Sequence, residues 1–174
     1  MSEIVFIRSS LQSLHSSLDE AMKGLSQEQA HWRPNDQGNH IAFIAWHYTR
    51  TVDNIIRFVL QGRRPTVWME GKWDERFGLD SRIQGTGMKP EDAAALRISD
   101  IPAFCTYMSQ VWKEAQFYMD TITESDLERK MTIRPLGELT LEQVLGNTLL
   151  THGYGHLGEI WLLKGLQGLQ GSPI

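Results

Sequence analysis

Apolar residues recur at steps of three and four in four stretches of the chain, which is the spacing of amphipathic helices. The stretches span residues 4–25, 41–59, 101–122 and 144–166. Gly24 lies near the expected end of the first helix, and Gly62 and Pro65 close the second. Helices of about 20 residues suit side-by-side packing at shallow angles. The pattern therefore predicts an all-α fold, a four-helix bundle.

Local signals indicate where the last two helices begin. Ser99 is a candidate cap for the third helix, with Pro102 tolerated in its first turn. Thr140 and Gln143 form a T-x-x-Q capping box ahead of the fourth helix. Residues 66–98 lack a sustained period, so we expect a long connection between helices 2 and 3 with a short helical turn or two. We also expect a short extended piece at residues 131–133.

Composition narrows the class of protein. The 174 residues are 41% apolar and 22% charged, which is typical of one globular domain spanning residues 1–174. A net charge of −4 lacks the basic excess needed for nucleic acid. The longest apolar runs are far shorter than the roughly 20 residues that cross a membrane.

With one cysteine, Cys105, and no signal-peptide pattern, we expect a cytoplasmic protein. Cys105 is interpreted as a small buried residue rather than a nucleophile, because no local motif lowers its pKa.

Candidate chemistry lies on the fourth helix, in the segment THGYGHLGEI. His152 and His156 are four residues apart and project from one face, a chelating spacing for one metal ion. A lone H-x-x-x-H is a weak signal, but these two lie on the side of the apolar contact residues. On the second helix, His47 also faces inward. The three histidines could form a metal site, or each could be a hydrogen-bonded core or boundary histidine.

The remaining histidines look less suitable. His15 and His31 lie among polar residues near helix surfaces or loops, and His40 is two turns from His47, near the helix start.

Glu159 lies on the same helix face as His152 and His156. It could accept a hydrogen bond from an imidazole N–H or act as a general base. Alternatively, it could pair with a cation such as Arg50, which is the interpretation favoured here.

Four segments carry a resemblance to a known family: LSQEQAHWRP, GNHIAFIAWHYTRTVDN, KWDERFG and THGYGHLGEIWLLKGLQGL. In this order and spacing the chain resembles DinB-like proteins, four-helix bundles related to thiol-dependent S-transferases that use mycothiol or bacillithiol. The resemblance implies a metal triad of His47, His152 and His156. The divalent transition metals Zn and Ni both accept this ligand set. The resemblance implies that the bound metal would activate a low-molecular-weight thiol or water.

Two functions follow as hypotheses. The first is a metal-dependent enzyme acting on a small-molecule substrate, either a thiol S-transferase or a hydrolase. The alternative is a non-catalytic, stress-associated bundle that binds a metal or ligand, or dimerises. The resemblance implies a homodimer.

Some further residues have two interpretations. Aromatic residues of the 66–77 segment could cover the metal as a lid, although core packing is the favoured role. Five glycines of the last helix each cost about 1 kcal/mol relative to Ala. Close approach of another helix, from the same subunit or a symmetry mate, would offset this cost, and so would a substrate pressed against the backbone near His152 and His156. The five glycines are Gly146, Gly153, Gly155, Gly158 and Gly165.

Overall fold

The computed structural model describes residues 2–134 and 136–173. Its helices are α1 (Glu3–Met22), α2 (Gln27–His31), α3 (Ile41–Asp53), the π-helical η1 (Asn54–Val59), α4 (Val67–Glu70), α5 (Trp73–Phe77), α6 (Pro90–Ala95), α7 (Ile101–Thr121), the 3₁₀ turn η2 (Glu124–Glu128), α8 (Leu141–Gln143), the π-helical η3 (Val144–Thr151) and α9 (His152–Leu166). Its strands are β1 (Lys130–Ile133) and β2 (Gly137–Thr140). The segments α8, η3 and α9 follow one another without a break, and residues 141–166 are called the C-terminal helix below.

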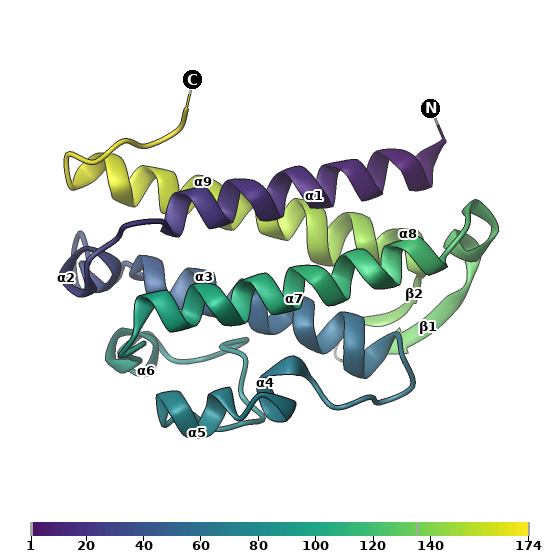
Figure 1. The fold of residues 1–174 in the computed structure, drawn as a ribbon, viewed down its shortest axis with the longest axis horizontal. Coiled ribbons are helices and arrows are strands. Elements are labelled where there is room, and N and C mark those ends of the chain that lie inside the picture. Colours follow the sequence, from purple (N-terminus) through teal and green to yellow (C-terminus); the bar gives the residue numbers. More distant parts are fainter. Residues whose placement is uncertain (1, 135, 174) are drawn as a thin grey trace.

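Four long helical segments lie side by side (Figure 1). In this view residues 41–59 run from left to right and the C-terminal helix runs from right to left. α1 packs against α7 and the C-terminal helix, and α3 packs against α7 and α9. The predicted stripes face the interior, where Leu14, Tyr48 and Met108 are fully buried. The all-α four-helix bundle is therefore confirmed.

Side-chain caps begin three of the long helices, and two of these caps bear on the sequence predictions. The capping box of Thr140 and Gln143 is present, as predicted. The prediction that Ser99 caps the third helix is wrong, because Asp100 is the capping residue and its Oδ1 accepts from the Ala103 N–H at 2.8 Å. A carboxylate here is favoured by the positive end of the helix dipole, and Asp100 also accepts from Arg76 at 3.0 Å.

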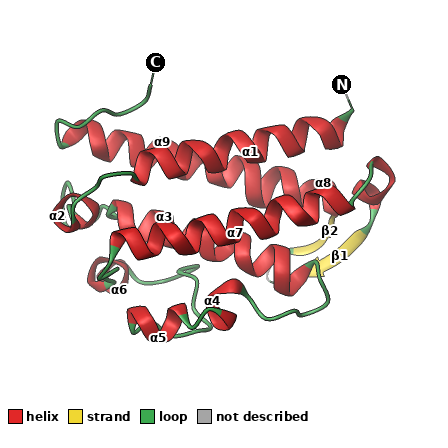
Figure 2. Ribbon diagram, in the orientation of Figure 1, coloured by secondary structure: helices red, strands yellow, loops and turns green. Residues whose placement is uncertain are grey.

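The connection between α3 and α7 contains three short helices, α4, α5 and α6 (Figure 2). Trp68, Trp73 and Phe77 are buried and pack against one another and against Tyr107 of α7. Because they lie in the core, their favoured packing role is confirmed and the lid hypothesis is wrong.

A hairpin of β1 and β2 precedes the C-terminal helix (Figure 2). The extended piece expected at residues 131–133 is confirmed as part of β1, whereas its partner strand was not predicted. The register pairs Ile133 with Gly137, so the turn follows immediately after Ile133.

Two features of the helices were not predicted. The short helix α2 begins at a capping box of Ser26 and Gln29, and this S-x-x-Q signal is present in the sequence. The π-helical turns η1 and η3 lie within long helices whose apolar spacing looks regular. π-Helical turns occur frequently at functional sites. No helix among the described residues is both long and apolar enough to cross a membrane.

Candidate metal centre

Three imidazole rings converge between α3 and the C-terminal helix. Nε2 of His47 lies 3.2 Å from Nε2 of His152, which lies 2.8 Å from Nε2 of His156. One nitrogen from each of the three rings falls within 4.8 Å of the others. All three side chains are half-buried. The structure thus brings together the three histidines that the sequence singled out.

The outer nitrogen of each ring is held by an oxygen acceptor. Nδ1 of His47 contacts the Gln84 carbonyl at 2.5 Å, and Nδ1 of His156 contacts Glu159 Oε2 at 2.8 Å. Nδ1 of His152 contacts the Thr148 carbonyl at a longer 3.3 Å. Because carbonyl and carboxylate oxygens only accept, each Nδ1 carries the proton in a neutral ring. The three Nε2 lone pairs therefore face one another.

Burial disfavours the charged, doubly protonated form of two of the three rings, His152 and His47. Burial, together with the neighbouring His156 and His47, lowers the pKa of His152 to about 4. Burial also lowers the pKa of His47. The hydrogen bond from His156 lowers the pKa of Glu159, so that carboxylate is ionised and accepts the imidazole N–H. Facing lone pairs without protons between them repel, and a cation removes that repulsion.

The cluster opens into a cleft of about 820 Å³. Among the described residues, six segments line the cleft: the turn of residues 37–39 ahead of α3, α3 with η1, the loop of residues 84–88, α6, the β1–β2 hairpin, and the C-terminal helix. Both π-helical turns contribute to the wall, through Asn54 and Ile55 of η1 and Asn147 and Thr148 of η3. A small molecule in the cleft would therefore contact the histidines directly.

Gln84 is positioned by a buried network on α3. Arg50 donates to the carbonyls of Ser81 at 2.8 Å and Ile83 at 3.2 Å, just ahead of Gln84. Asp53 accepts from the backbone N–H groups that begin α4, at 2.8 and 2.9 Å. Arg50 and Asp53 lie 3.7 Å apart and are both buried. One helix therefore supplies His47 and also anchors the connection that orients its ring.

Gly85 allows this connection to approach His47 closely. Its φ of +88° is a left-handed conformation that favours glycine. A Cβ at this position would lie 3.1 Å from His47 Nδ1 and 3.2 Å from Phe43 Cζ. A side chain larger than hydrogen would therefore press on the ring that Gln84 holds.

Comparisons with known proteins agree with this architecture. Residues 10–160 match the family model of the DinB superfamily. The chain belongs to the DinB superfamily. A crystal structure of a conserved protein from Enterococcus faecalis has the same fold, with a TM-score of 0.79 over 95% of this chain and 97% of that chain at 20% sequence identity. The comparison with curated proteins found no match.

The other histidines of this DinB superfamily chain lie away from the triad, but not all where expected. His15 is buried rather than near a polar surface, and its ring stacks on Trp112 with the centroids 4.0 Å apart. His40 caps the start of α3 by accepting from the Phe43 N–H at 3.0 Å. The expectation for His15 was wrong because its stripe neighbours Leu11 and Leu18 determine which face is buried, whatever the polarity of the adjacent serines.

Glu159 takes the role of imidazole acceptor. The favoured pairing with Arg50 is wrong, because Arg50 is directed at the connection and at Asp53. Cys105 is half-buried and burial raises its pKa, in agreement with a non-nucleophilic role.

Among the five glycines of the C-terminal helix, only Gly153 is in close contact with other described residues. A Cβ there would lie 2.5 Å from Leu14 Cδ2 and 2.6 Å from Tyr48 Cζ. The other four, Gly146, Gly155, Gly158 and Gly165, have nothing within 4 Å among the described residues. The close-approach hypothesis therefore holds inside the bundle only at Gly153.

The sequence reasoning missed Gln84, Gly85 and the anchor formed by Arg50 and Asp53. Arg50 lies three residues after His47 and Asp53 three residues after Arg50, and this i, i+3 spacing of opposite charges was the available signal. A backbone carbonyl such as that of Gln84 has no signal in the sequence.

Proposed function

We propose that the chain binds a divalent transition metal, Zn or Ni, through His47, His152 and His156, and acts with it as an enzyme that transfers a small thiol to an electrophilic substrate. The observation that carries the proposal is the convergence of three Nε2 atoms whose partner Nδ1 atoms are all held by acceptors. Hydrogen bonds on the outer nitrogen fix ring orientation in metal-binding histidines and raise their basicity.

The donor set fits such an ion. Ligand bonds of about 2.0–2.1 Å with tetrahedral angles place neighbouring nitrogens about 3.3 Å apart, and angles nearer 90° place them about 2.9 Å apart. The separations of 3.2 and 2.8 Å lie close to these values. When bound by three neutral imidazoles, a divalent cation keeps an open position and lowers the pKa of a thiol or water ligand to near neutrality.

The walls of the cleft support a thiol over water. Glu159 is engaged with His156, and no Asp or Glu of the described residues lines the cleft. A water nucleophile is commonly assisted by such a general base, whereas a thiol starts from a lower pKa and needs less help. In the proposed reaction the thiol proton leaves to solvent, sulfur forms a bond to the electrophilic carbon, and the leaving group departs with its bonding electrons.

Elemental analysis tests the metal site. Wild-type protein, dialysed after exposure to Zn²⁺ or Ni²⁺, is expected to retain one ion per chain, and His152→Ala is expected to retain far less. His31→Ala is the matched control, because His31 is half-buried and outside the triad. Equal metal content in wild type and His152→Ala would contradict the proposed site.

A thiol screen tests the reaction. Low-molecular-weight thiols are combined with electrophilic acceptors, with and without added metal, and thioether formation is followed by mass spectrometry. Metal-dependent product in wild type but not in His152→Ala supports the transferase. Metal-dependent hydrolysis of the acceptor without thiol addition would instead identify a hydrolase.

A further inference from the structure

The cleft continues away from the histidines toward the β1–β2 hairpin. Thr51, Asn54 and Ile55 follow His47 on the same side of its helix and line the cleft. With a rise of about 1.5 Å per residue, Asn54 lies about 10 Å beyond His47 along the helix. Asn147 of the C-terminal helix lines the opposite wall. A ligand that fills this length must be elongated.

Arg134 is the one formally charged side chain among the described residues that line the cleft. It lies at the end of β1, in the turn of the hairpin, and is exposed. Within the described part of the chain, Arg134 has no ion pair, whereas Lys130 of the same hairpin pairs with Glu138 at 3.1 Å. The far end of the cleft therefore carries an unneutralised positive charge, although the whole chain is acidic at −4.

The wall between the two ends combines polar and apolar groups. The side-chain amides of Asn54 and Asn147 line the cleft and make no hydrogen bond to other described side chains or backbone groups. Ile55, Ile133 and Leu139 supply apolar contact. This wall suits a chain that is partly apolar and carries hydrogen-bonding groups.

We propose that Arg134, with Asn54 and Asn147, forms a second subsite that binds the terminal carboxylate of an elongated ligand whose other end reaches the three histidines. The proposal rests on the proposed function, which places the thiol end of the ligand at the triad. A guanidinium offers several N–H donors in one plane and pairs with a carboxylate by charge-assisted hydrogen bonds. Arg134 is thus a specificity-determining residue.

Binding of simple probes to the Co²⁺-loaded protein tests this subsite. The probes are ω-mercaptoalkanoic acids of increasing chain length and the matching ω-mercaptoalkanols, and the Kd is measured from the sulfur-to-cobalt absorption band. At the length that spans about 10 Å, the acid is expected to bind about tenfold more tightly than the alcohol. Shorter acids and alcohols are expected to bind alike.

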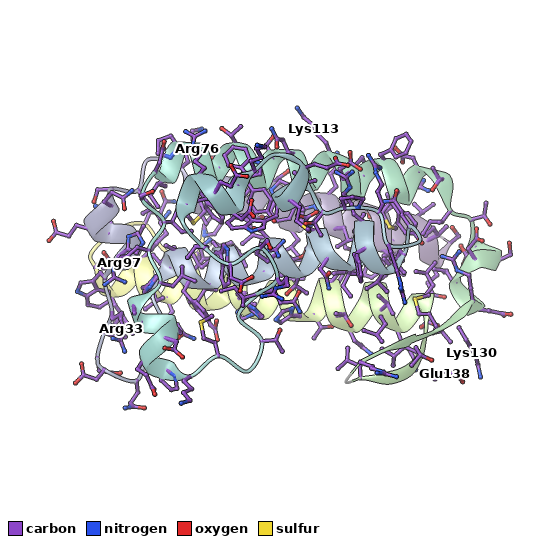
Figure 3. The ribbon with its side chains drawn as sticks, turned by 90° about the horizontal axis from the view of Figure 1, so that it is seen from below. Arg33, Arg76, Arg97, Lys113, Lys130 and Glu138 are labelled. Carbon is purple, nitrogen blue, oxygen red and sulfur yellow. The ribbon has the colours of Figure 1, made fainter. Side chains whose placement is uncertain are left out.

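Two variants test whether Arg134 causes the preference for the acid over the alcohol. Arg134→Gln is expected to abolish the tenfold difference while leaving the Kd of the alcohol unchanged. Lys130→Gln removes the same charge from the same hairpin, but outside the cleft, and is expected to keep the difference. Lys130 and its partner Glu138 are labelled together on the hairpin in Figure 3.

Three results would overturn the subsite: equal binding of acid and alcohol at every length, a preference that survives Arg134→Gln, or tighter binding of a matching ω-mercaptoalkyl phosphate than of the acid. Failure of acids and alcohols alike to bind would overturn the proposed function and the subsite with it. The two failures are therefore distinguishable.

Discussion

Gly153→Ala tests whether the approach of α9 to α1 and α3 sets both the stability of the bundle and the geometry of the triad. The added Cβ would lie 2.5 Å from Leu14 Cδ2 and 2.6 Å from Tyr48 Cζ. Both side chains are fully buried, so neither can swing into solvent. Gly153 follows His152 directly and Tyr48 follows His47, so any adjustment would separate two rings of the proposed metal site.

The expected effect is the difference of two terms. Overpacking of a buried site costs about 1–3 kcal/mol, and we take the upper end because two side chains from different helices must shift. Replacing a helical glycine by Ala returns about 1 kcal/mol. The free energy of unfolding should therefore fall by about 2 kcal/mol, which for a chain of this size lowers the Tm by about 4–8 °C.

Gly158→Ala is the matched control on the same helix. Nothing among the described residues lies within 4 Å of its added Cβ, so only the propensity gain of about 1 kcal/mol remains. Its Tm should rise by about 2–4 °C. Thermal unfolding followed by circular dichroism, with and without metal, measures both variants.

The reasoning would be refuted if Gly153→Ala were as stable as Gly158→Ala and retained wild-type metal affinity. The expected homodimer can be examined with the same control. A destabilisation of Gly158→Ala that grows as the protein is diluted would indicate that a second copy covers this face of α9.

Two further predictions concern His15 and Glu159. Burial lowers the pKa of His15 to about 3, so its contribution to stability is full above the unfolded pKa of about 6.5 and is lost as the pH falls toward 3. Between pH 7 and pH 5, urea unfolding of wild type should therefore lose about 2 kcal/mol more than that of His15→Leu, and equal losses would contradict this. Glu159→Ala removes the acceptor for the N–H of His156 and should weaken metal binding about 10- to 100-fold, whereas Glu159→Gln, which can still accept, should weaken it less; unchanged metal affinity in Glu159→Ala by competitive titration would exclude the positioning role.

Local sequence was sufficient to predict the long helices. The spacing of apolar residues specifies which face of each helix is buried, and this held even where η1 and η3 widen the helix. The capping box of Thr140 and Gln143 was also evident, because a cap is formed by residues three apart. The choice between Ser99 and Asp100 was missed because both are capping residues and the difference depends on Arg76, which is distant in sequence.

The candidate site divides in the same way. The i, i+4 spacing of His152 and His156 is a property of the helix that carries them, and so is the i, i+3 contact of His156 with Glu159. By itself, the sequence thus determined four helices and one chelating pair. Only the tertiary structure decided that His47 completes the cluster and that the Gln84 carbonyl orients its ring, because these contacts join residues that are 105 and 37 positions apart. It also decided that Arg134 lines the same cleft, because this depends on how the hairpin packs beside the helices.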